Sequence, residues 1–155
     1  MNEPQTHSYE FGEFRVDRMK RLLLRGDDNA LGRIYIRQER YAEAIAALTR
    51  ARELSGGGSE PITQLGYALA KSGNRERART TLADLKSLAA ENYVPAYNFA
   101  MIYNGLGERE EALNYLEKSF EQREVQITFI KIDTRWNELR AEPHFAKIVK
   151  QMNLE

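Results

Sequence analysis

The chain has no cysteine among its 155 residues. This absence excludes disulfide bonds, thiol catalysis and thiolate metal sites, so the fold must be held together by packing and polar contacts. Only two histidines are present, His7 and His144, and neither has a partner at the spacing of a metal site or a catalytic triad. We therefore expect no catalytic residue, no metal and no cofactor, and hence no enzyme activity.

The chain also has no excess of charge of one sign and no long apolar run. Its 23 Lys and Arg residues balance its 23 Asp and Glu residues. A neutral protein has no overall field that would draw it to DNA, RNA or an anionic membrane. No apolar stretch approaches the roughly 18–20 residues that span a bilayer, and the N-terminal stretch lacks the basic-then-apolar order of a signal peptide. We therefore expect one cytoplasmic folding unit without a membrane partner.

What the sequence does contain is an internal repeat. Each copy begins with a large residue, a small residue and a second large residue: Leu31-Gly32 with Tyr35, Leu65-Gly66 with Leu69, and Phe99-Ala100 with Tyr103. The second half keeps the same register: Ala44, Leu48 and Ala51 match Ala78, Leu82 and Leu85, and then Ala112, Leu116 and Ser119. Successive copies are 34 residues apart. A period of this length is typical of stacked helix pairs.

The spacing inside a copy predicts two amphipathic helices that pack against each other. Leu31 and Tyr35 lie four residues apart on one helical stripe, and Ala44 and Leu48 have the same spacing on a second. Glycine or alanine at the crossing of the two helices allows their backbones to approach closely.

The turn between the two helices is predicted by glycine. Gly73 and Gly107 stand at equivalent positions, where a residue with left-handed backbone conformation would end the first helix. The first copy has Glu39 at this position. If Glu39 adopts the same conformation, we expect it to cost about 1 kcal/mol.

This pattern resembles the tetratricopeptide repeat, whose units place a large residue and Gly in the first helix and Ala residues in the second. The resemblance implies an all-α solenoid of three helix pairs, with units at about 25–58, 59–92 and 93–126 inside a domain over 27–155. The chain departs from the family at its early Trp, which is Asp28, Ile62 and Ala96 here, and at its late Pro, which is Gly56, Ala90 and Glu124. These departures affect the unit boundaries more than the resemblance.

After residue 126 the register stops, although apolar residues continue toward the C-terminus. The last repeat of a solenoid has an apolar face that must be covered. The segment 133–145, which ends in Pro143-His-Phe145, resembles the closing segment of bacterial tetratricopeptide proteins. We therefore expect a C-terminal cap over 127–155, with Pro143 at the start of its helix and Trp136 as a core anchor.

Residues 1–26 form a separate segment that allows two interpretations. Tyr9–Asp17 together with Arg21–Gly26 resembles the opening β-hairpin of the winged-helix domain of response-regulator-type transcription factors. The alternative is a helix over Asp17–Arg25 that covers the free face of the first repeat. Because the chain passes directly into the first repeat, no recognition helix is left, and we do not expect sequence-specific binding of nucleic acid. A strand here would also provide an edge for a homo-oligomer.

The family resemblance also indicates where a partner would bind. The first helix of each tetratricopeptide unit lines a concave face, and the family's ligand-facing positions fall on Asn29, Arg33, Ile36, Arg37, Thr63, Tyr67, Lys71, Tyr97, Met101 and Asn104. These residues combine three cations with two tyrosines and with amides, which suits a peptide that carries carboxylates. The resemblance therefore implies a scaffold that binds a peptide or a partner protein. The alternative is a remnant or partner of a winged-helix transcription regulator.

DNA binding separates these two functions. A basic cluster in the N-terminal segment contains Arg15, Arg18, Lys20, Arg21 and Arg25. Without an element that enters a groove, such a cluster contacts only phosphates, so we expect duplex binding to be weak, independent of sequence and lost at physiological salt. Electrophoretic mobility shifts with unrelated duplexes at low and moderate salt measure this. Tight binding to one duplex that survives physiological salt would favour the regulator.

Overall fold

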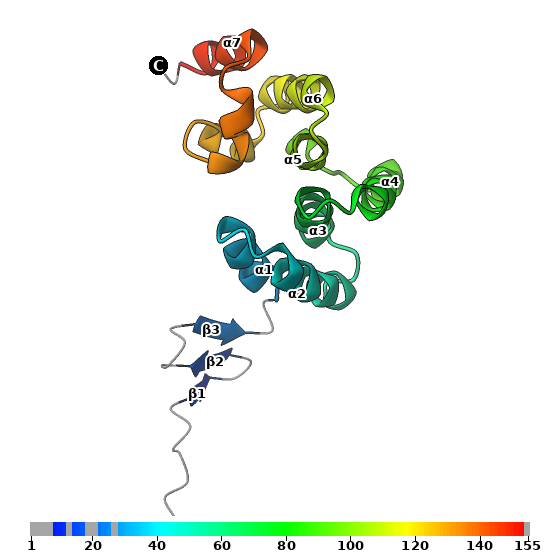
Figure 1. The fold of residues 1–155 in the computed structure, drawn as a ribbon, viewed down its shortest axis with the longest axis vertical. Helices are drawn as coiled ribbons and strands as arrows, with labels where there is room; N and C mark the ends of the chain where they lie inside the picture. The colour runs from blue at the N-terminus through cyan, green and yellow to red at the C-terminus, as the bar shows by residue number, and fades with distance from the viewer. Residues whose placement is uncertain (1–7, 12–13, 18–21, 26–27, 154–155) are drawn as a thin grey trace, which may run out of the picture.

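The structure is a computed structural model that describes residues 8–11, 14–17, 22–25 and 28–153. Its first elements are the strands β1 (Ser8–Phe11), β2 (Phe14–Asp17) and β3 (Leu22–Arg25). They form an antiparallel sheet in the order β1-β2-β3, and the helices follow in a curved stack (Figure 1). β3 lies in the range where the alternative interpretation placed a helix. Arg18, Lys20 and Arg21 of the basic cluster lie outside the described residues.

Three helix pairs follow, and each pair falls within one unit of the sequence repeat. They are α1 (Asp28–Arg37) with α2 (Tyr41–Leu54), α3 (Ser59–Lys71) with α4 (Arg75–Glu91), and α5 (Ala96–Leu106) with α6 (Arg109–Glu121). Two 3-10 helices, η1 (Val125–Phe129) and η2 (Thr134–Leu139), and the helix α7 (Pro143–Gln151) form the C-terminal cap. The fold is thus the all-α solenoid that the sequence predicts. In the described part of the chain, no helix is both long and apolar enough to cross a membrane.

The turn inside each pair is the same in all three repeats. Glu39, Gly73 and Gly107 have positive φ angles of 57°, 87° and 73°. The next residue donates its backbone N–H to the carbonyl five positions earlier: Arg40 to Tyr35 at 2.9 Å, Asn74 to Leu69 at 2.9 Å, and Glu108 to Tyr103 at 3.0 Å. These bonds satisfy carbonyl groups that a helix end leaves without a partner. Glu39 thus has the left-handed conformation for which we expect a cost of about 1 kcal/mol.

Small residues set the distance between neighbouring helices. A Cβ atom added to Gly32 in α1 would overlap the side chain of Leu48 in α2, and one added to Gly66 in α3 would lie 2.7 Å from Cδ1 of Ile102 in α5. The alanines at the fourth position of the second helices, Ala44, Ala78 and Ala112, are fully buried. The small residues therefore allow close packing both within a pair and between successive pairs.

The left-handed Glu39 generates a stability prediction. We expect Glu39→Gly to raise the free energy of unfolding by about 0.5–1 kcal/mol, because glycine adopts a positive φ without steric cost. Urea denaturation of the variant and the wild type measures the difference. The matched controls are Gly73→Ala and Gly107→Ala, which should lower stability, since an added Cβ contacts no other atom there and only the backbone conformation is strained. Equal stability of Glu39→Gly and wild type would contradict the prediction.

Candidate functional site

The ten residues that the family resemblance assigns to ligand contact lie on α1, α3 and α5, and we refer to them together as the inner face. Six of them are buried: Ile36, Thr63, Tyr67, Tyr97, Met101 and Asn104. Asn29 and Lys71 are partly exposed, and Arg33 and Arg37 are exposed. The inner face is therefore accessible mainly in the first repeat.

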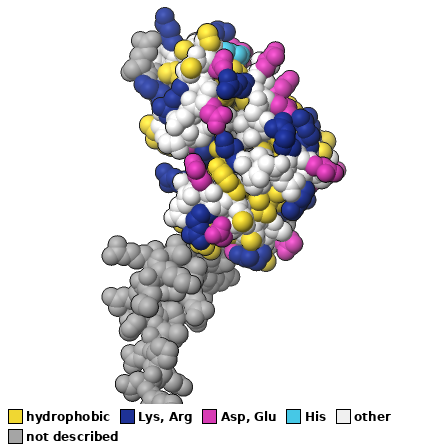
Figure 2. All heavy atoms as spheres, in the orientation of Figure 1, with side chains coloured by type: hydrophobic (Ala, Val, Ile, Leu, Met, Phe, Trp, Pro, Cys, Tyr) yellow, Lys and Arg dark blue, Asp and Glu magenta, His cyan; other side chains and the backbone are white. Residues whose placement is uncertain are grey.

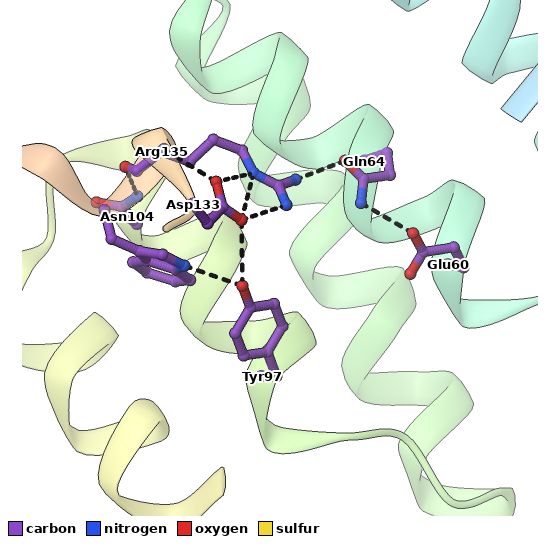
Figure 3. Close-up of polar contacts among 7 residues, drawn as sticks. Glu60, Gln64, Tyr97, Asn104, Asp133 and Arg135 are labelled. Carbon is purple, nitrogen blue, oxygen red and sulfur yellow. Dashed lines mark hydrogen bonds and ion pairs between the residues drawn. The ribbon is translucent and has the colours of Figure 1, made fainter. Parts of the chain in front are cut away.

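An ion pair at the start of η2 ties the cap to the second repeat. Arg135 binds the carboxylate of Asp133 through Nε at 2.9 Å and Nη2 at 2.6 Å, and both side chains are mostly buried (Figure 3). Burial raises the pKa of Asp133, but the hydrogen bonds and charge of Arg135 outweigh it, and the pKa is lowered overall. Nη1 of Arg135 donates to Oε1 of Gln64 in α3 at 3.1 Å. The guanidinium of Arg135 thereby holds the cap against α3 while it keeps its hydrogen bonds to Asp133.

Tyr97 and Trp136 join the cap to the third repeat. Nε1 of Trp136 donates to the hydroxyl of Tyr97 at 2.9 Å, and the two rings meet edge to face with centroids 5.4 Å apart. The same hydroxyl donates to Oδ2 of Asp133 at 3.4 Å. Trp136 is fully buried, as expected for the core anchor of the cap. A ligand can therefore reach the Tyr97 hydroxyl only if the cap moves.

η2 contacts three further residues of the inner face. Nδ2 of Asn104 donates to the backbone carbonyl of Arg135 at 2.8 Å, and Nζ of Lys71 lies 3.1 Å from Oε1 of Glu138. The guanidinium of Arg135 also lies 6.0 Å from the ring centroid of Tyr67. The chain's own C-terminal segment thus occupies the inner face of the second and third repeats.

The first repeat keeps an open part of the inner face. Arg33 and Arg37 lie one turn apart on α1, and both are exposed. Neither guanidinium pairs with a carboxylate among the residues that the structure describes. The nearby Arg40 differs, because it binds Glu43 at 2.8 Å. Within the described part of the chain, these two cations on the inner face of α1 therefore have no carboxylate partner.

One buried carboxylate was not predicted to have a role. Glu124, which sequence reasoning treated only as a replacement for the family's late Pro, is 7% exposed. Its carboxylate accepts the backbone N–H groups of Ala96 at 2.7 Å and Tyr97 at 3.0 Å, and the hydroxyls of Ser119 at 2.7 Å and Tyr93 at 3.0 Å. Glu124 therefore caps the N-terminus of α5 from the residues that follow α6. No local sequence pattern indicates this contact, because Ala96 lies 28 positions away.

The residues through which the cap binds the inner face were also missed. Sequence reasoning placed Trp136 in the cap but assigned no contact to Gln64, Arg135 or Glu138. The available signal was Asp133, whose Oδ1 accepts the backbone N–H of Arg135 at 3.0 Å and so begins η2 as an N-cap. That signal predicts where a helical turn begins, but not which surface it packs on.

The described surface carries charges of both signs. Cationic and anionic side chains alternate over the face of the helical stack shown in Figure 2. Among the described residues, no group of three His, Asp or Glu side chains is placed to hold a metal ion. A curved stack of helix pairs with a partly covered inner face defines a helical-repeat protein.

Comparison with known families agrees with this class. The tetratricopeptide repeat pattern matches residues 35–97 and, in a second match, residues 96–125. The chain belongs to the tetratricopeptide repeat family. Repeats of this family generally mediate protein–protein interactions and are not catalytic. Neither a curated protein nor a solved structure matches the chain.

The lowered pKa of Asp133 predicts a pH dependence of stability. Because an unfolded Asp titrates near pH ~3.9, the unfolded chain binds this proton at a higher pH than the folded chain does. The stabilisation of the fold by the Asp133 carboxylate is therefore complete above the pKa of the unfolded chain. It is lost as the pH falls through the lower pKa of Asp133 in the folded protein. We expect wild type to lose more stability on acidification than Asp133→Asn, which is less stable at neutral pH by about 1–3 kcal/mol.

Urea denaturation at a series of pH values from neutral to strongly acidic measures this difference. Asp84→Asn serves as the matched control, because Asp84 pairs with Arg52 at the surface, where an ion pair contributes little. The assignment of Asp133 would be wrong if its variant and wild type lost stability in parallel below pH ~4.

Proposed function

We propose that this protein is a scaffold that binds an acidic segment of a partner protein on the inner face of its first repeat. The observation that carries the proposal is the exposure of Arg33 and Arg37 without a carboxylate partner among the described residues. Side chains four residues apart lie on the same face of a helix, so both guanidinium groups can bind one acidic segment. Arginine suits this role because its planar group binds a carboxylate through two parallel hydrogen bonds.

The rest of the inner face limits where such a segment can lie. Lys71 on α3 is partly exposed, but its ammonium group already binds Glu138 of the cap. A ligand carboxylate at Lys71 would compete with this surface ion pair, which costs little to break. The six buried residues of the inner face would support the site without touching the ligand while the cap stays in place. The proposed contacts are therefore Arg33, Arg37, Asn29 and Lys71.

A second candidate function is a remnant or partner of a winged-helix transcription regulator. The antiparallel sheet of β1, β2 and β3 supports this alternative, because the sequence of this segment resembles the start of such a domain. Against it, every α-helix in the described part of the chain belongs to a repeat or to the cap. No described helix is left to enter a DNA groove. We therefore favour the scaffold.

A charge-reversal variant tests the proposed site. We expect Arg33→Glu/Arg37→Glu to lose partners that wild type retains, because two repulsive charges replace two cations. Both proteins are immobilised and exposed to lysate of the native cell, and the retained proteins are identified by mass spectrometry. For a partner found in this way, the dissociation constant of the purified complex should rise about tenfold or more.

The matched control is Arg77→Glu/Lys150→Glu, which makes the same change in net charge at two exposed positions away from the inner face. It should bind as wild type does. Circular dichroism must show the same helix content and melting temperature for all three proteins. If the control variant loses the partner as fully as Arg33→Glu/Arg37→Glu does, the attraction depends on net charge and the proposed site is wrong.

A further inference from the structure

A second surface lies away from the inner face, where the end of α4 meets α5 and α6. It contains a pocket of about 530 Å³. The apolar part of its lining includes Ala89, Val94, Ala96, Phe99 and Tyr115. Lys86 of α4 and Lys118 of α6 also line the pocket, and none of the described residues that line it is acidic. The pocket therefore combines an apolar floor with positive charge.

The two lysines lie over a stack of aromatic rings. The ring of Tyr115 stacks with that of Phe99, at a centroid distance of 5.1 Å, and with that of Tyr103, at 5.4 Å. Nζ of Lys86 lies 5.7 Å from the ring centroid of Tyr103, and Nζ of Lys118 lies 5.9 Å from that of Tyr115. Hydrogen bonding to Tyr103 raises the pKa of Lys86, so its ammonium group stays charged. The rings hold two positive charges at one site but do not neutralise them.

The preceding repeat provides an internal comparison. The residues 34 positions before Lys86 and Lys118 are Arg52 (86 − 34) and Asp84 (118 − 34). These two residues form an ion pair of 2.9 Å that joins α2 to α4. The equivalent place between α4 and α6 therefore has two cations where the preceding repeat has a neutral pair. Among the described residues neither of these two cations forms an ion pair, so this place lacks the anion that Asp84 supplies in the preceding repeat.

The carboxylates around the pocket do not supply that anion. Glu111 is the weakest of the groups that raise the pKa of Lys86. Glu124, which accepts a hydrogen bond from Tyr93 of the pocket, is buried and already accepts four hydrogen bonds in all. Both lysines therefore remain available to a carboxylate from outside the described residues.

We propose that this pocket binds an acidic peptide segment of a partner protein. A carboxylate of the segment lies near Lys86 and Lys118, in the role that Asp84 has in the preceding repeat, and a neighbouring apolar side chain packs on the floor. The exposed amides of Asn92 and Gln122 at the pocket supply donors and acceptors for a peptide backbone. This site is separate from Arg33 and Arg37, so it goes beyond the proposed function.

Binding of a defined probe tests this site. The probe is a short fluorescein-labelled peptide that alternates Glu and Phe, and its binding is followed by fluorescence anisotropy at about 0.15 M salt. The parent protein is Arg33→Glu/Arg37→Glu, so that the inner face does not contribute. We expect the parent to bind the probe, and Lys118→Asp in this parent to weaken binding about tenfold or more, because the introduced carboxylate would pair with Lys86 as Asp84 pairs with Arg52.

Matched variants separate the pocket from net charge and from misfolding. Lys150→Asp in the same parent changes the charge equally at an exposed position on α7 and should bind the probe as the parent does. Lys118→Asp should melt at the same temperature as the parent or higher, since the introduced carboxylate would form an ion pair with Lys86. If it melts lower, Lys86→Gln/Lys118→Gln replaces it, with the same loss of binding expected.

Three results would overturn the inference. The first is a parent protein that does not bind the probe, which would leave the inner-face proposal standing. The second is equal binding of a peptide with Gln in place of Glu, which would exclude recognition of carboxylates. The third is unchanged binding in a folded Lys118→Asp or Lys86→Gln/Lys118→Gln protein, which would place the probe elsewhere.

Discussion

A stack of helix pairs leaves an apolar face uncovered at its end. In this chain the C-terminal cap covers that face, and it also determines how much of the inner face is open. Trp136, Leu139, Phe145 and Ile148 of the cap are buried. A buried Trp needs an acceptor for its indole N–H, and Trp136 finds one in the hydroxyl of Tyr97. This contact holds η2 over α5, on residues that the family resemblance assigns to ligand contact. The cap that stabilises the end of the solenoid therefore also covers part of the inner face.

Polar contacts set where the cap lies, while apolar burial supplies the stability. Apolar side chains tolerate small shifts, whereas a buried ion pair is favourable only when each charged group keeps its hydrogen-bond partners. Arg135 meets this condition with Asp133 and Gln64, and Asp133 meets it with Arg135 and Tyr97. A shift of η2 would break the hydrogen bonds of Arg135 and Asp133, and it would leave these mostly buried charged groups without partners. We infer that this network fixes the position of the cap on α3 and α5.

The repeat, the helix pairs and their turns could be predicted from the sequence because they depend on residues close in the chain. Glu39 shows this most directly, since its left-handed conformation follows from alignment with Gly73 and Gly107. The covered inner face could not be predicted, because it depends on contacts such as Arg135 with Gln64, which are 71 positions apart. The ten residues of the inner face were chosen from a family pattern that assumes an open surface. The choice between hairpin and helix near the N-terminus stayed open because the alternation of residues there is weak.

A position that differs among the three repeats shows which of its residues packing or ion pairing within the fold explains. Arg37 and Lys71 are equivalent positions of successive repeats, and the third repeat has Gly105 there (37 + 34 = 71, and 71 + 34 = 105). A Cβ atom at Gly105 would lie 3.1 Å from that of Ala70, so packing explains the glycine. Glu138 of the cap neutralises Lys71. Neither reason applies to Arg37. Its side chain is exposed, and no carboxylate among the described residues pairs with it. Arg37 is therefore one of the two cations on which the proposed binding of an acidic segment rests.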